Sequence, residues 1–246
     1  MSKQKRGTGM VSKALLKEAA ELLPKMPHTD DITEIKNFLE NNLPFNSETT
    51  RKRYRSYITT YLFPEDNVDH EILNFAQYAS SESIKNVCLY RFSEKYPLIY
   101  DIFKDVFLPN LNKRKIQKKE LDDYLKKRFS NNNPGRFGGR GFVEALTGAN
   151  VMIYQKGMLK YQHRPIDLSS FTFILHSEFP TPGMYNINLL KENQAFIPQL
   201  WRKQELVDTL YQLRNQDLLS KISNIDMMQQ FTTKHTLSEI VEKLGE

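Results

Sequence analysis

The helical spacing of apolar residues between positions 45 and 62 constrains the fold of this chain more than any other feature. Aromatic and aliphatic residues recur there at i, i+3, i+4, i+7 and i+8, the spacing of one helix face. This apolar stripe consists of Tyr54, Tyr57, Ile58, Tyr61 and Leu62. Asn46 or Ser47 is suited to accept hydrogen bonds from the first turn. The segment is therefore predicted to be one amphipathic helix.

The face opposite the stripe carries hydroxyl and cationic side chains, namely Thr49, Lys52, Arg53 and Ser56. Upstream, residues 30–42 predict another helix, with Asp30 as a cap, and a short turn at residues 43–45 separates the two. Helix, turn and basic second helix form a helix-turn-helix pattern, whose second helix reads the DNA major groove. This interpretation requires Lys52 and Arg53 to project outward, free of internal acidic partners. A solvated helix in an ordinary bundle is the alternative.

The composition predicts a soluble protein with either one large core or two small ones. The chain has 246 residues, of which 39% are hydrophobic and 26% charged. Its single cysteine, Cys88, excludes an internal disulfide and is interpreted as a core residue. No apolar run approaches the ~20 residues that cross a bilayer, and no hydrophobic segment follows the basic N-terminus. We therefore expect a cytoplasmic protein with no membrane partner.

Charge is distributed in alternating blocks along the chain. Residues 1–64 contain 11 basic and 7 acidic residues, whereas residues 65–111 contain 4 and 8. Residues 112–164 contain 13 basic and 4 acidic residues, and residues 165–246 contain 7 and 10. Segregated positive charge favours a polyanionic partner through steering and counterion release. Charge sign alone does not distinguish DNA from RNA.

The second basic block has helical spacing over residues 112–129, with its cations on the outer side. These are Lys113, Arg114, Lys115, Lys118, Lys119, Lys126, Lys127 and Arg128. A solvated helix face and a phosphate-binding face both fit this pattern. Residues 130–141 follow, rich in Asn and Gly, and predict a loop that serves as a hinge. With Arg136 and Arg140, this basic hinge also has the composition of a nucleic-acid clamp.

The remaining segments predict a mainly α protein with some β structure near its end. Helical spacing occurs at residues 12–23, 68–79, 83–96, 97–108 and 202–216. Residues 141–162 predict a helix followed by an extended segment, and residues 171–176 fit either a strand or a buried helix. A hairpin centred on residues 224–226 follows the helix at 202–216, which indicates a winged-helix element. Thr236 and Glu239 predict a capping box that begins a last helix, ended by Gly245.

These segments divide into four regions. We expect an N-terminal helix-turn-helix domain at residues 1–64 and a central helical bundle at 65–129. The basic hinge at 130–141 then leads to a winged-helix-like α+β domain at 142–246. The C-terminal domain has net negative charge, so its wing is suited to contact protein instead of DNA.

Residue patterns for catalysis or metal binding were not found. The five histidines lack carboxylates or cysteines at metal-ligand spacing, and no nucleophile elbow, zincin, dinucleotide-binding or kinase motif occurs. We therefore expect a protein without enzymatic activity, cofactor, bound metal or small-molecule substrate.

Three strings resemble the BrxA proteins of bacterial BREX phage-exclusion systems, and the similarity extends over most of the chain. They are PFNSETTRKRYRSYITTYL, YPLIYDIFKDVFL with the basic helix after it, and LVDTLYQLRNQDLLSKISNIDMMQQFTT. The resemblance implies a mainly helical, non-enzymatic DNA-binding component of a multi-protein defence system that distinguishes phage from host DNA. The DNA contacts carried over are Ser47, Thr49, Thr50, Arg51, Lys52, Arg53 and Arg55. The joint at residues 130–141 departs from the family's pattern.

Together these observations predict a protein that binds double-stranded DNA and has other proteins of the defence system as further partners. The first basic helix would face the major groove, while the second block, with Arg136 and Arg140, would neutralise phosphates. An RNA-binding or antitermination-like helical module and a protein-interaction scaffold are the alternatives. A transcriptional regulator is a variant of the first interpretation.

Overall fold

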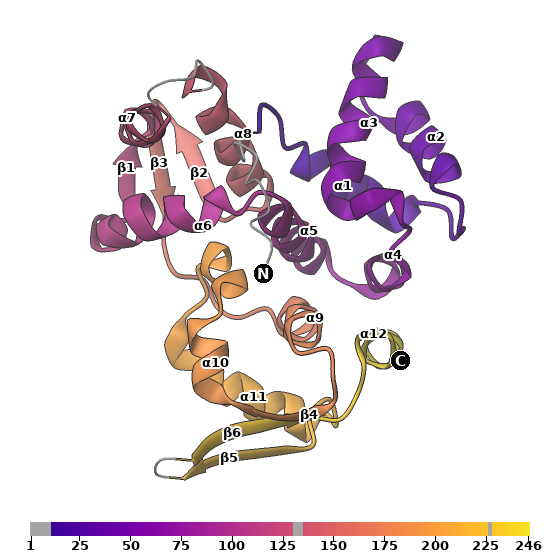
Figure 1. The fold of residues 1–246 in the computed structure, drawn as a ribbon, viewed down its shortest axis with the longest axis vertical. Coiled ribbons are helices and arrows are strands. Elements are labelled where there is room, and N and C mark those ends of the chain that lie inside the picture. Colours follow the sequence, from indigo (N-terminus) through magenta and orange to yellow (C-terminus); the bar gives the residue numbers. More distant parts are fainter. Residues whose placement is uncertain (1–10, 130–134, 226–227) are drawn as a thin grey trace, which may run out of the picture.

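The computed structural model describes residues 11–129, 135–225 and 228–246 and is mainly helical, as predicted (Figure 1). Two small antiparallel sheets of three strands each complete the fold. Every helix in these ranges is too short or too polar to cross a lipid bilayer. The domain boundaries at residues 64, 129 and 141 stay a prediction.

Three helices form the N-terminal part. They are α1 (Leu16–Leu22), α2 (Ile32–Asn42) and α3 (Glu48–Leu62). α1 begins later than predicted, because Leu15 takes a left-handed conformation with φ of 53°. Asp31, rather than Asp30, caps α2 by accepting a hydrogen bond from the Thr33 amide at 2.7 Å. Ser47 caps α3, its Oγ accepting from the Thr50 amide at 3.4 Å.

The central part of the chain contains α5, a helix that is buried along most of its length. α4 (His70–Tyr78), α5 (Ser81–Lys95) and α6 (Leu98–Ile102) lie where periodicity predicted helices. A π-helical turn (Phe103–Phe107) and a 3-10 helix (Leu108–Lys113) extend α6. α5 lies at the centre of the molecule, with α1, α3, α8 and α9 around it (Figure 1). The larger hydrophobic core runs from Val11 to Tyr161 and includes Val241 of the last helix.

The prediction of one helix over residues 112–129 was wrong at its start. Arg114 takes a left-handed conformation with φ of 56°, and β1 (Lys115–Gln117) follows it. Only then does α7 (Lys118–Arg128) begin, with the Gln117 amide donating to Glu120 Oε1 at 2.8 Å. β1 pairs with residues 158–160, far along the chain. Helical periodicity does not reveal such long-range pairing.

The loop predicted over residues 130–141 was also wrong for its second half, because α8 (Gly135–Gly148) begins there. Its glycines allow close packing. A Cβ at Gly139 would lie 2.5 Å from Asp122 Oδ1 of α7, and one at Gly141 would lie 2.2 Å from the Val11 carbonyl. Glycine here lets a helix approach its neighbours, and does not break the helix. Residues 130–134 lie outside the described residues.

The first sheet has the strand order β1-β3-β2 and covers one end of the larger core. β2 (Met152–Gln155) and β3 (Met158–Tyr161) are the extended segment that the sequence predicted. Lys156 and Gly157, with φ of 49° and 78°, form the two-residue turn between them. Positive φ at both positions matches a type I′ hairpin turn. Ile116, Leu159 and Tyr161 face the core.

The C-terminal part combines helices with the second sheet. Its elements are α9 (Leu168–Glu178), β4 (Gly183–Asn186), α10 (Ile187–Glu192), α11 (Leu206–Asn215), β5 (Lys221–Ile225) and β6 (Met228–Thr233). Residues 171–176 lie in α9, so the buried-helix alternative was correct. The hairpin after α11 is present, and β4 joins it as a strand that the sequence did not predict, in the order β4-β6-β5. A second hydrophobic core lies between these elements.

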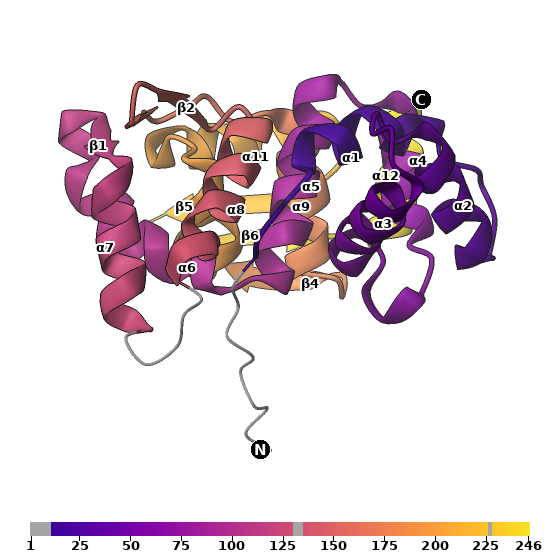
Figure 2. The same ribbon diagram turned by 90° about the horizontal axis from the view of Figure 1, so that it is seen from above.

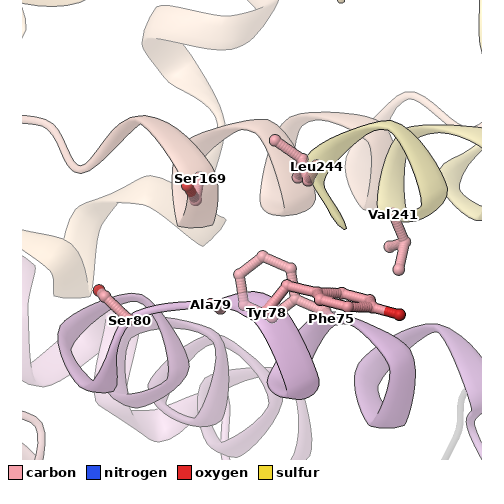
Figure 3. A pocket seen from close by; sticks show the side chains of 7 residues that line it. All are labelled: Phe75, Tyr78, Ala79, Ser80, Ser169, Val241 and Leu244. Carbon is pink, nitrogen blue, oxygen red and sulfur yellow. The ribbon is translucent and has the colours of Figure 1, made fainter. Parts of the chain in front are cut away.

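The last helix, α12 (Leu237–Gly245), joins the two cores. Its predicted capping box is present, because the Thr236 amide donates to Glu239 Oε2 at 2.7 Å. Val241 belongs to the larger core and Ile240 to the second. Figure 3 shows Val241 and Leu244 of α12 facing Phe75 and Tyr78 of α4 across a hollow of about 50 Å³. That volume holds no more than a water or two.

Candidate nucleic-acid interface

The predicted outer face of α3 is exposed. Thr49, Lys52, Arg53 and Ser56, here called the basic face of α3, are all solvent-accessible. On the opposite side, Ile58, Tyr61 and Leu62 are buried, and Tyr54 and Tyr57 pack against the core as partly buried residues. The amphipathic helix predicted from the sequence is therefore confirmed. α2 packs against α3, so the two helices of the motif are in contact.

Lys52 does not meet the expectation that it is free of acidic partners. Its Nζ lies 2.5 Å from Glu48 Oε1 and 3.8 Å from Glu40 Oε1. The hydrogen bond that Lys52 donates to Glu48 and the charges of both carboxylates raise the pKa of Lys52. The Glu48 pair spans i to i+4 on an exposed helix face, where solvent screening leaves such pairs only a small contribution to stability. Lys52 is therefore partly neutralised, but weakly held.

Arg53 meets the expectation. Its guanidinium lies over the Tyr54 ring, 5.2 Å from the ring centroid, and within the described residues no carboxylate pairs with it. Stacking on an aromatic ring orients a guanidinium without using its N–H donors. Arg53 therefore presents a full positive charge and free donors beside Thr49 and Ser56.

The other two α3 arginines hold the motif together. Arg51 Nη1 donates to the Phe45 carbonyl at 2.7 Å and to the Asn46 carbonyl at 3.0 Å, which fixes the turn before α3. Arg55 forms an ion pair with Glu40 of α2. Both side chains are half-buried, as is that of Thr50. Of the contacts carried over from the family resemblance, these are the least available to a ligand.

The second basic block divides in the same way. Lys118 pairs with Asp122 at 2.6 Å, and Arg128 pairs with Asp101 at 2.5 Å while donating to Tyr124 Oη. Lys113 donates to the neutral Asn110 side chain at 2.8 Å. The exposed cations whose side chains have no partner among the described residues are Arg114, Lys115, Lys119, Lys126, Lys127 and Arg140. The side chain of Arg136 lies outside what the structure describes.

The first sheet adds cations that the sequence reasoning did not select. Lys160 of β3 is the register partner of Lys115 in β1, and both are exposed on the outer face of the sheet. Lys156 projects from the β2–β3 turn. The Lys156–Gly157 pair was the sequence signal that could have located these cations, because it is typical of a hairpin turn. That signal predicts the turn but not the pairing of β1 with β3.

The two basic regions lie on opposite sides of the molecule. In both Figure 1 and Figure 2, β1 and α7 occupy the left side and α2 and α3 the right side, with α5 and α8 between them. They therefore form two separate surfaces. One duplex reaches both only if it runs along the molecule.

The part of the chain that the structure describes contains neither a metal-binding group nor a reactive thiol. No group of three or more His, Cys, Asp or Glu side chains there is placed to hold a metal ion. Cys88 is fully buried in the larger core, as predicted, and burial raises the pKa of its thiol to about 12. The thiolate, which is the nucleophilic form, is therefore scarce at neutral pH.

Comparison with known proteins gives one match. The model of the BrxA family matches residues 9–133, about half of the chain. This region contains α1 to α7, with the basic face of α3 and most of the second basic block. It includes two of the three strings on which the resemblance rests, and not the third at residues 206–233. No curated protein and no solved structure matches the chain.

Proposed function

The chain belongs to the BrxA family, whose members are components of BREX defence systems, and on that basis we propose that it binds double-stranded DNA without an enzymatic activity of its own. The observation that carries the proposal is the basic face of α3. There Arg53 is exposed and unpaired within the described residues, beside the free hydroxyls of Thr49 and Ser56.

In this proposal α3 enters the major groove. Arg53 pairs with guanine N7 and O6, and the hydroxyls of Thr49 and Ser56 pair with several bases, so sequence reading is limited. Lys52 exchanges its exposed Glu48 partner for a phosphate at small cost. Arg51 and Arg55 hold the turn and the α2–α3 packing, so they support the groove-facing residues rather than contact DNA.

The second basic block supplies phosphate contacts. Lys115, Lys119, Lys126, Lys127 and Arg140 are exposed and without side-chain partners among the described residues. Contacts of this type fix position and give affinity without reading sequence. Lys156 and Lys160 extend the same surface over the first sheet.

The C-terminal part supports a winged-helix assignment. The order α9, β4, α10, α11, β5, β6, with the strand order β4-β6-β5, is the element order of a winged helix. In that assignment α11 is the recognition helix and β5–β6 the wing. Residues 165–246 contain 7 basic and 10 acidic residues, so we propose that this module contacts other proteins of the defence complex.

Fluorescence anisotropy of a labelled DNA duplex, titrated at several salt concentrations, tests the proposal. We expect log Kd to rise linearly with log salt, with about 0.9 in slope for each phosphate contacted. Arg53→Ala is expected to weaken binding by about 1–3 kcal/mol without changing stability. Lys25→Gln is the matched control, because Lys25 is an exposed cation on the 3-10 turn after α1, outside both basic regions.

Three results would reject the proposal. A Kd that does not change with salt, or an equal loss of DNA affinity in the Arg53 and Lys25 variants, would favour a protein-interaction scaffold. The third result is that an RNA hairpin displaces the labelled DNA as strongly as duplex DNA of equal length does. The deep, narrow major groove of A-form RNA hides its base edges from a helix, so equal competition would favour the RNA-binding alternative.

A further inference from the structure

A cavity of about 100 Å³ is lined by residues of α9, α10 and α11, and these three helices lie in the lower half of Figure 1. Its floor and walls come from the second hydrophobic core, from the segment around residues 163–166 and from residues 193–203, which include a 3-10 helix (Gln194–Gln199). Leu108, from the 3-10 helix after α6, closes the side toward the larger core. An engineered apolar cavity of about 150 Å³ holds a benzene molecule, so this space suits a group of about that size or slightly smaller.

The walls are aromatic and aliphatic. Phe171, Phe196 and Trp201 form a cluster whose ring centroids lie 5.5 to 6.1 Å apart. Ile166, Leu190, Ile197, Leu200 and Leu206 complete the lining. A mostly apolar pocket with a few polar groups at its edge is the usual form of a small-molecule site.

The polar lining residues are His163 and Asn193 together with three cations. Lys191, Arg202 and Lys203 line the cavity and are exposed, and no carboxylate is among the lining residues. Arg202 Nη1 donates to Glu205 at 2.8 Å, and Lys191 donates to the neutral Gln229 side chain at 3.0 Å. Lys203 forms no salt bridge within the described residues. Of the three rim cations, Arg202 is therefore paired, while Lys191 and Lys203 have no carboxylate partner among the described residues and lie above an apolar interior.

We propose that this cavity binds a small amphipathic anion, an aromatic or branched aliphatic carboxylate. Its apolar group lies against Phe171, Phe196 and Trp201, and its carboxylate is held by Lys203 and Lys191 at the rim. Apart from Leu108, the lining residues lie outside the residues that match the BrxA family, so the site does not depend on the DNA-binding proposal. This ligand contradicts our expectation from the sequence of a protein without a small-molecule partner.

Trp201 is the single tryptophan of the chain and lines the cavity, so its fluorescence reports occupancy at this site. The full chain, without DNA, is titrated with 3-phenylpropionate and, separately, with 3-phenylpropylamine, which has the same ring and the opposite charge. We expect a saturable change in tryptophan emission with the acid, with a Kd on the order of 1 mM, since a ligand of this size has little surface to bury. The amine is expected to bind at least about tenfold more weakly, because the cationic rim repels it.

Three variants locate the binding. Ile166→Phe fills the cavity and is expected to abolish the response, with a thermal melt to verify that it folds. Lys203→Gln keeps the cavity and is expected to weaken the acid about fivefold, as for one exposed charge contact. Lys221→Gln is the matched control, because Lys221 is exposed on β5 and does not line the cavity.

The proposal is supported only if the acid saturates, the amine is weaker and Lys203→Gln differs from Lys221→Gln. Absence of a saturable response to the acid would overturn it. Equal affinity for acid and amine, or an unchanged response in a folded Ile166→Phe variant, would overturn it as well. DNA affinity is not used in any of these measurements, so their failure leaves the proposed function to its own test.

Discussion

The imidazole of His176 is fully buried in α9, and neither ring nitrogen has a hydrogen-bond partner among the described residues. Burial lowers the pKa of His176 to about 4, since a charged imidazolium would lose its hydration there. The main chain near Leu218 and His235 partly offsets this effect, without meeting hydrogen-bond geometry. His176 is therefore neutral in the folded protein over most of the pH range.

This burial makes stability pH-dependent. The unfolded chain binds a proton at His176 near pH 6.5, while the folded chain does so only near pH 4, so stability is full above 6.5 and falls as the pH drops between these values. Urea denaturation is expected to show a loss of about 2 kcal/mol from about pH 7.5 to about pH 5. His176→Leu should remove most of that dependence, and His28→Gln, at an exposed histidine, should keep it. Equal pH dependence in the two variants would contradict this account.

Gly141 is a second residue whose local packing is testable. A methyl group there would lie 2.2 Å from the Val11 carbonyl, a main-chain atom that has little freedom to move. Gly141→Ala is expected to destabilise the protein by about 1–3 kcal/mol in urea denaturation. Gly183→Ala is the control, because its nearest neighbour would lie at 3.8 Å, an ordinary contact. A destabilisation that is the same for both would show that close packing of α8 is not the cause.

At the scale of single elements, α3 separates its cations by role along its length. Arg51 and Arg55 are half-buried and bind the turn and α2, while Lys52 and Arg53 are exposed. The helix thus uses one pair of cations to hold its position and leaves the other pair on the surface. The Glu48–Lys52 pair was recognisable from the sequence, because Glu followed by Lys four residues later is a favourable helix pair.

This division predicts different effects on stability. Arg55→Ala removes the close partner of the largely buried Glu40 carboxylate and leaves it only Lys52, at 3.8 Å, so the variant is expected to destabilise the protein by about 1–3 kcal/mol. Lys52→Ala removes the exposed pair with Glu48 and a longer contact with Glu40, which keeps Arg55, so it is expected to change stability much less. Chemical denaturation of both variants at one pH measures the difference. If Lys52→Ala costs as much as Arg55→Ala, α3 does not divide its cations in this way.

At the scale of the whole molecule, the separation of the two basic regions sets the length of DNA that reaches both. A compact chain of this length has a radius of gyration of about 18 Å, so opposite sides of the folded molecule lie roughly 45 Å apart. One turn of DNA covers only about 34 Å. A duplex of about ten base pairs therefore reaches one basic region, whereas one of about 24 base pairs reaches both.

Duplex length should decide how much the second basic block matters. Replacing Lys119, Lys126 and Lys127 by Gln is expected to reduce the salt slope by about 2–3 on the longer duplex and much less on the shorter one. The control variant replaces Lys25, Lys221 and Lys243, which lie outside both regions, with the same loss of charge. Anisotropy titrations on the two duplexes make the measurement. An equal reduction of the salt slope on both duplexes would mean that the second basic block alone binds DNA.

Local features could be predicted from the sequence because neighbours in the chain produce them. The amphipathic character of α3 follows from the spacing of its apolar residues. The capping box joins Thr236 to Glu239, only three residues away. The burial of Cys88 follows from its apolar character. Features made by distant segments could not be predicted. β1 is a strand because residues 158–160 lie beside it, and the glycines of α8 serve close packing because α7 and Val11 leave no room for side chains there.

The sequence by itself determined which residues are cationic, which helices are amphipathic and to which family the chain belongs. Only the tertiary structure decided which cations are available, because burial and acidic neighbours from other turns and helices hold Arg51, Arg55 and Arg128. It also decided that the two basic regions lie apart, and that side chains from α9, α10 and α11 enclose a cavity. Distances between residues remote in the chain are set by packing, and a single sequence does not contain them.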